Sequence, residues 1–302
     1  MSEVRLPALV GDSPLAILAA IGTVRLIRDS TDPCTRLFWD SDAIPVLSST
    51  LVSLDAVVAQ LEGIVAGMPN GVTVPGGPVG FPPPGAAPDK LRVKLGELRS
   101  LIDLTSGDVV WSWVAGLVTD LVADKDGRGM ISQFAAPAGK QSMATMLEKP
   151  LELVRAKPSY LREALCGWRR VSGVTGEYLD ARASWDSCDD PEGKADMRGV
   201  PGATWLALMS YPMWLTTAAG SSVRTSGWHA FTEGRRHVQE LRLPLWSEPL
   251  GPEAIRALVE HPALDGTWES LDWTVLGLLG VTRICRARRR PALKSAGPLA
   301  VV

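Results

Sequence analysis

The sequence predicts an α+β protein that is predominantly helical, with short antiparallel strands. Apolar residues at helical spacing dominate the first part of the chain. Short apolar or alternating runs are clearest in the second part, above all QELRLPLW at 239–246. The composition, 46% hydrophobic and 21% charged, is typical of a folded globular protein.

The strongest helical signal is the run 13–28. Ser13 can cap this helix, Pro14 suits its first position, and Asp32-Pro33 ends the run. Four small residues within it allow a neighbouring element to approach closely: Ala16, Ala19, Ala20 and Gly22. We therefore expect a core helix around which the other elements pack.

The next elements are predicted from their apolar spacing. A short strand is expected at 36–40, and residues 44–47 lead into a helix at 49–67. Pro and Gly make up more than half of residues 69–88, so this stretch is predicted to be a long loop. Further helices are expected at 89–104, 108–124, 140–156 (interrupted at Pro150) and 160–167.

The chain changes character after residue 170. Residues 171–199 are polar and acidic, which favours an excursion with a hairpin at most. Helices are expected from 201 and over 252–260, with strands at 214–217, 239–246 and 281–286. We interpret 1–170 as a helical core domain containing the loop 69–88, and 171–302 as a Trp-rich α+β region with a basic C-terminal segment; a single domain is the alternative.

Charge and cysteine content narrow the class of protein. A net charge of -2 argues against a generic polyanion binder. The 4 cysteines lack the spacing of a zinc site or a disulfide scaffold, so a reducing cytoplasm is expected. The N-terminus does not resemble a secretory signal, and no apolar run approaches the ~20 residues that span a bilayer, so no membrane partner is expected.

The sequence contains no familiar catalytic or metal-binding constellation. The 3 histidines lack metal-ligand spacing and are expected on the surface, and no serine lies in a nucleophile-elbow motif. We therefore expect no catalytic residues, no metal and no cofactor, with a stand-alone enzyme whose site is cryptic as an alternative.

Two segments are candidates for contact with nucleic acid. Gly139 to Ser142 departs from the phosphate-binding loop of nucleotide hydrolases, yet a helix start with Lys140, Gln141 and Ser142 can hold a backbone phosphate. An ordinary helix start and a contact with another subunit are the alternatives for this segment. The second is a run without acids: Arg283, Arg286, Arg288, Arg289 and Arg290.

Guanidinium groups bind phosphates bidentately, so this run is expected to make several salt-dependent contacts. A solvated basic tail is the alternative interpretation. We expect replacement of Arg288, Arg289 and Arg290 by Ala to weaken retention of nucleic acid and to leave thermal stability nearly unchanged.

Four fragments stand out for their order along the chain: 13–27 (SPLAILAAIGTVRLI), 138–142 (AGKQS), 200–210 (VPGATWLALMS) and 241–258 (LRLPLWSEPLGPEAIRAL). Together they resemble a family of CRISPR-associated proteins, the subtype-specific effector or accessory subunits of type I-U/I-G. The resemblance implies a non-catalytic subunit of an antiviral RNA-guided complex, with other effector subunits, guide RNA and target DNA as partners. A protein-only scaffold is the alternative outside that family.

Overall fold

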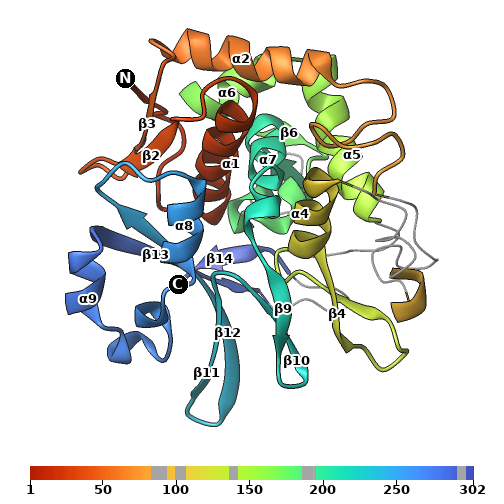
Figure 1. The fold of residues 1–302 in the computed structure, drawn as a ribbon, viewed down its shortest axis with the longest axis vertical. Coiled ribbons are helices and arrows are strands. Elements are labelled where there is room, and N and C mark those ends of the chain that lie inside the picture. Colours follow the sequence, from red (N-terminus) through yellow and green to blue (C-terminus); the bar gives the residue numbers. More distant parts are fainter. Residues whose placement is uncertain (83–93, 99–106, 136–141, 186–192, 194, 291–296) are drawn as a thin grey trace.

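The computed structural model describes residues 1–82, 94–98, 107–135, 142–185, 193, 195–290 and 297–302. It has an α+β fold with antiparallel strands, as predicted, but the expected predominance of helix is not confirmed, because the described strands form five sheets. Helices form one end of the molecule, and antiparallel hairpins project from the other (Figure 1). Within the described part of the chain, no helix has the length and apolar character needed to cross a membrane.

The central element is α1 (Pro14–Ser30), as predicted. All of its residues from Pro14 to Ile27 are buried, so it is enclosed on every side rather than along one stripe. Helix α7 (Pro201–Leu208) runs beside it and approaches so closely that a Cβ on Gly22 would lie 1.8 Å from the carbonyl oxygen of Leu206. Ser13 is at the N-cap position, but its side chain makes no capping hydrogen bond.

A three-stranded antiparallel sheet adjoins α1, in the order β1 (Ser2–Arg5), β3 (Pro45–Ser49) and β2 (Arg36–Trp39). Helix α2 (Leu54–Gly67) follows, capped by the Ser53 side chain, which accepts from the Ala56 N–H.

The described part of the Pro/Gly-rich loop, 69–82, packs against the protein. The Gly80 N–H donates to the Gly71 carbonyl at 2.9 Å, and Val72, Val74 and Phe81 are buried. The rest of this loop, 83–88, lies outside the described residues.

The predicted helix 108–124 is correct only to Leu117. Helix α4 (Asp108–Leu117) gives way to a hairpin of β4 (Val118–Ala123) and β5 (Gly129–Ile131), in which Val118 and Thr119 pair with Ile131 and Met130. Helix α5 (Met143–Ala156) continues through Pro150, which the sequence predicted to interrupt it. Helix α6 (Ser159–Cys166) follows; of the predicted helix 89–104, only 94–98 are described.

The second half supplies strands and short helices. The predicted excursion contains a small sheet in the order β6 (Val171–Ser172), β8 (Asp196–Gly199) and β7 (Ser184–Trp185). After α7 comes a hairpin of β9 (Thr216–Ala219) and β10 (Ser222–Thr225). A four-stranded antiparallel sheet follows, in the order β11 (Trp228–Glu233), β12 (Arg236–Trp246), β13 (Val281–Arg289) and β14 (Leu299–Val301). Helices α8 (Pro252–Val259) and α9 (Trp273–Leu278) lie in the connection between β12 and β13.

The described residues share a hydrophobic core that runs from Val4 to Leu299. Helix α7, from the second predicted region, lies among α1, α5 and α6 of the first. Four tryptophans are fully buried in this core: Trp113, Trp205, Trp214 and Trp246. The two predicted regions therefore meet through buried apolar side chains rather than across a linker.

Candidate nucleic-acid interface

The sheet formed by β11, β12 and β13 has two chemically different faces. Leu241, Leu243 and Cys285 point to the buried core side. Because side chains alternate along a strand and residues opposite each other share a face, the register assigns a charged set to the other side. We call it the outer sheet face: His229, Phe231, Glu233, Arg236, Glu240, Arg242, Arg286 and Arg288.

One buried carboxylate organises this face. Glu240 is fully buried and accepts hydrogen bonds from three arginines. Arg242 Nε donates at 2.9 Å, Arg286 donates bidentately at 3.0 Å through Nε and Nη2, and Arg288 Nε donates at 2.9 Å. Such charge-assisted contacts fix all three guanidinium planes.

The outer sheet face carries more positive than negative charge. Arg288 also contacts Glu233 at 3.1 Å, and Arg236 stands opposite Glu233 in the register. The outer sheet face therefore has four arginines and two carboxylates, an excess of two positive charges. Arg242 is fully buried, whereas Arg286 and Arg288 are partly exposed and so accessible from solvent.

Aromatic rings flank these guanidinium groups. The Arg286 group lies 4.3 Å from the centroid of the Trp268 ring, and Arg242 and Arg288 lie 5.1 and 5.7 Å from Phe231. Cation–π contacts of this kind stabilise a cation without neutralising it. The charges of the partly exposed Arg286 and Arg288 therefore remain available to an anionic partner, whereas Arg242 is fully buried.

The ionisation of Glu240 follows from its surroundings. Burial by itself would raise the pKa of Glu240, but the hydrogen bonds from Arg286, Arg242 and Arg288 outweigh it and hold the pKa below the ordinary 4.5. A carboxylate whose pKa is lowered on folding stabilises the folded protein above its unfolded pKa. That contribution is lost as the pH falls through the folded value.

We expect Glu240→Gln to lower the free energy of unfolding at neutral pH by about 3 kcal/mol, because three arginines lose their counter-charge. The difference from wild type should begin to shrink as the pH falls below 4.5, the ordinary pKa, and should disappear once the pH is below the lowered pKa of Glu240 in the folded protein. Urea denaturation at a series of pH values measures this. Glu248→Gln, on the exposed turn after β12, is the control and should show no such pH-dependent difference.

The five arginines proposed from the sequence have three different environments. Arg286 and Arg288 lie on the outer sheet face. Arg283 is exposed and donates to the Ser41 carbonyl at 3.2 Å, and Arg290 is exposed just after β13. The alternation in VTRICRARR, at 281–289, is the signal that this run is a strand rather than a solvated tail.

Arg289 points inward and is structural. Its guanidinium donates to the carbonyls of Gln133, Phe134, Tyr178 and Gly297 at 3.1, 2.7, 2.9 and 3.0 Å. Burial lowers the pKa of Arg289 to about 10, so it is still protonated at neutral pH. These contacts revise the expectation that replacing Arg288, Arg289 and Arg290 leaves stability nearly unchanged.

The second predicted segment is described only at Ser142. Ser142 caps α5: its hydroxyl accepts from the Thr145 N–H at 3.1 Å, while the Ser142 N–H donates to the Thr145 hydroxyl at 2.8 Å. Lys140 and Gln141 lie outside the described residues. The Ser142 hydroxyl is thus already engaged in a reciprocal cap.

A His–Asp pair that the sequence analysis did not predict lies at the edge of the outer sheet face. His229 was expected on the surface, but it is buried, and its Nδ1 lies 2.9 Å from Asp265 Oδ1. Burial lowers the pKa of His229 by more than the hydrogen bond to Asp265 raises it, so the ring is neutral at neutral pH. The two residues are far apart in sequence, and no motif joins them.

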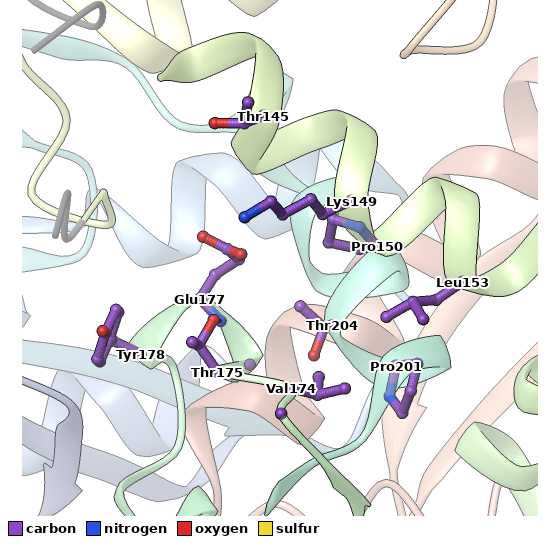
Figure 2. A pocket seen from close by; sticks show the side chains of 12 residues that line it. Thr145, Lys149, Pro150, Leu153, Val174, Thr175, Glu177, Tyr178, Pro201 and Thr204 are labelled. Carbon is purple, nitrogen blue, oxygen red and sulfur yellow. Dashed lines mark hydrogen bonds between the residues drawn. The ribbon is translucent and has the colours of Figure 1, made fainter. Parts of the chain in front are cut away.

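A cavity of about 320 Å³ lies on the helical side of the molecule, between α5, the turn 173–178 and the start of α7. Figure 2 shows Lys149 and Glu177 pointing toward one another across it. Gly176, Glu177 and Tyr178 all have positive φ, and Arg289 holds the Tyr178 carbonyl. Since Lys149 and Glu177 contribute one charge of each sign, this cavity is a poorer site for a polyanion than the outer sheet face.

Comparisons with known proteins do not identify a relative of this chain, so its function has to be inferred from the residues described above. No family model matches the chain, and no curated protein matches it. Among the described residues, no group of three or more His, Cys, Asp and Glu side chains could hold a metal ion.

Proposed function

We propose that this chain is a non-catalytic, cytoplasmic subunit of a type I CRISPR RNA-guided surveillance complex. In this proposal it contacts neighbouring effector subunits and the backbone of the guide RNA or target DNA. The observation that carries the proposal is the positive excess on the outer sheet face, with Arg286 and Arg288 held in place by Glu240.

The resembling fragments support the same proposal through their positions in the fold. Fragment 13–27 lies in α1 and fragment 200–210 contains α7, and these two helices pack together in the core. Fragment 241–258 contributes most of β12 together with α8. These three fragments thus contribute to the scaffold that supports the outer sheet face.

Binding of nucleic acid on one face only is compatible with the net negative charge of the whole chain. A chain of net charge -2 does not attract nucleic acid over its whole surface. An excess of two charges on one sheet face, with partly exposed guanidinium groups, suits a few phosphates of a strand that other subunits also hold. Binding by the isolated chain is then expected to be weak and strongly salt-dependent.

A protein-only scaffold is a second candidate, favoured by the segment around α9. Trp273 is 45% exposed and Leu278 is 84% exposed, next to Trp268, whose ring contacts Arg286. Exposed apolar side chains gathered in this way are typical of docking surfaces. In the proposed complex this segment would face a neighbouring subunit.

Arg236→Ala tests the proposed interface. Arg236 is exposed on the outer sheet face, and its loss should weaken binding of a labelled single-stranded RNA at low salt roughly fivefold, because one phosphate contact is lost. Fluorescence anisotropy measures the affinity, and the melting temperature should not change.

Arg162→Ala is the matched control. Arg162 lies on α6, at the end of the molecule opposite the β11–β12 hairpin, and forms an exposed ion pair with Asp55 at 2.7 Å (Figure 1). Equal affinity losses in both variants, or none in Arg236→Ala, would argue against the outer sheet face as the interface. Turnover of RNA or of a nucleotide by the purified chain would instead favour the enzyme alternative.

A further inference from the structure

A second cavity, of about 320 Å³, lies between two hairpins, β9–β10 and β11–β12. Strands β10 and β11 are each at the edge of their sheet, and only Ser226 and Gly227 connect them. Gly227 has φ +80, and the two hairpins diverge from this point (Figure 1). The residues that determine the chemistry of the cavity are Gln133, Arg224, Trp228, His229, Gln239 and Asp265.

Two glutamine amides are fixed at this cavity. Gln133 Oε1 accepts from the Thr225 N–H at 2.9 Å, and the Gln133 N–H donates to the Thr225 hydroxyl at 3.0 Å. Gln133 Nε2 donates to Gln239 Oε1 at 3.0 Å, which orients the Gln239 amide with its NH2 group as a donor. Gln239 is exposed, so a ligand can reach this donor.

His229 lines another wall of the cavity. It is 5% exposed, and its Nδ1–H donates to Asp265, which leaves Nε2 of the neutral ring as an acceptor. Within the described part of the chain, His229 Nε2 and Trp228 Nε1 are buried without hydrogen-bond partners. Buried polar atoms without partners are costly, so either nitrogen would gain from a ligand atom that reached it.

The charges at this cavity favour a neutral ligand. Arg224 lies 3.7 Å from Asp265, so the one guanidinium lining the cavity is matched by a carboxylate. The carboxylate of Asp265 would repel a free anionic metabolite. It would not repel a neutral planar group with hydrogen-bond donors and acceptors along its edge. The volume is near the lower end of the range for small-molecule pockets, about 300 Å³, which suits one ring system.

We infer that this cavity receives one unpaired nucleobase of the strand whose phosphates lie on the outer sheet face. Nucleobases are neutral and planar, carry donors and acceptors on their edges, and pack against aromatic rings such as that of Trp228. The two surfaces adjoin, because His229 stands opposite Glu240 in the β11–β12 register. This inference rests on the proposed function and adds recognition of a base to contact with the backbone.

The experiment compares two single-stranded RNA probes of equal length, one intact and one with abasic positions throughout, which present similar phosphates. Wild-type protein should bind the intact probe at least about fivefold more tightly at low salt. Gln239→Ala removes the exposed amide, and Ser222→Trp fills the cavity from the exposed end of β10. Both variants should bind the two probes with nearly equal affinity, and both should keep the wild-type melting temperature.

Gln60→Ala is the matched control, because Gln60 is a surface amide on α2 that contacts Ser30 far from both hairpins. It should retain the wild-type preference. Equal binding of the two probes by wild-type protein, or an unchanged preference in both variants, would overturn the nucleobase inference while leaving the backbone interface intact. If neither probe binds, the proposed function itself fails, and the nucleobase inference fails with it.

Discussion

Arg289→Ala should lower the free energy of unfolding by about 3–5 kcal/mol, with a fall in melting temperature of roughly 10 °C. The Arg289 guanidinium ties together three segments far apart in sequence through the carbonyls of Gln133, Phe134, Tyr178 and Gly297. Without it, several buried carbonyls lose their donor. Removal of the buried charge offsets part of this loss, because burial of the guanidinium is itself unfavourable, as its lowered pKa indicates.

Arg290→Ala is the control for this prediction. Arg290 is exposed one residue further along the chain, so its loss should change stability by no more than about 0.5 kcal/mol. Thermal melts followed by circular dichroism compare the two variants. Wild-type stability in Arg289→Ala would show that the four carbonyls find other donors and that Arg289 is not structural.

Gly22→Ala should destabilise the protein by about 3 kcal/mol or more. A Cβ at position 22 would lie 1.8 Å from the Leu206 carbonyl oxygen and 2.9 Å from the Leu206 carbonyl carbon. These are backbone atoms of α7, so relief requires the two buried helices to separate rather than a side chain to rotate. Separation would open gaps in the central part of the core.

Gly63→Ala, in contrast, should stabilise the protein. Gly63 is exposed on α2, and a Cβ there would have no neighbour within 4 Å. Alanine is a better helix former, so this variant should be more stable by about 0.5–1 kcal/mol. Urea denaturation gives both values, and a similar effect from the two substitutions would contradict the close approach of α1 and α7.

The elements that the sequence predicted well are those with a strong local period. Helix α1 and strand β12 were expected from apolar spacing, and the small residues of α1 correctly indicated a close neighbour. The end of α4 was predicted too late, because Val118 and Leu121 continue the helical spacing of Val114 and Leu117. Tertiary pairing with β5 decides that segment, and local propensity does not contain it.

The residues of the proposed interface were also predicted only where the signal is local in sequence. The arginine run drew attention to 283–290, yet which arginines face outward depends on the strand register with β12. Glu240 and the pair His229–Asp265 escaped prediction because each acts through a partner that is distant in sequence. Local spacing carries no information about such pairs, whereas antiparallel pairing brings them within hydrogen-bond distance.

The salt dependence of RNA binding tests the central claim most directly, namely that the outer sheet face holds nucleic-acid backbone. If Arg236, Arg286 and Arg288 each contact a phosphate, a plot of log Kd against log salt concentration should have a slope of about 2 for a single strand. The slope should decrease in Arg236→Ala and remain unchanged in Arg162→Ala. A flat plot for wild-type protein would contradict the claim and favour a scaffold that contacts only protein.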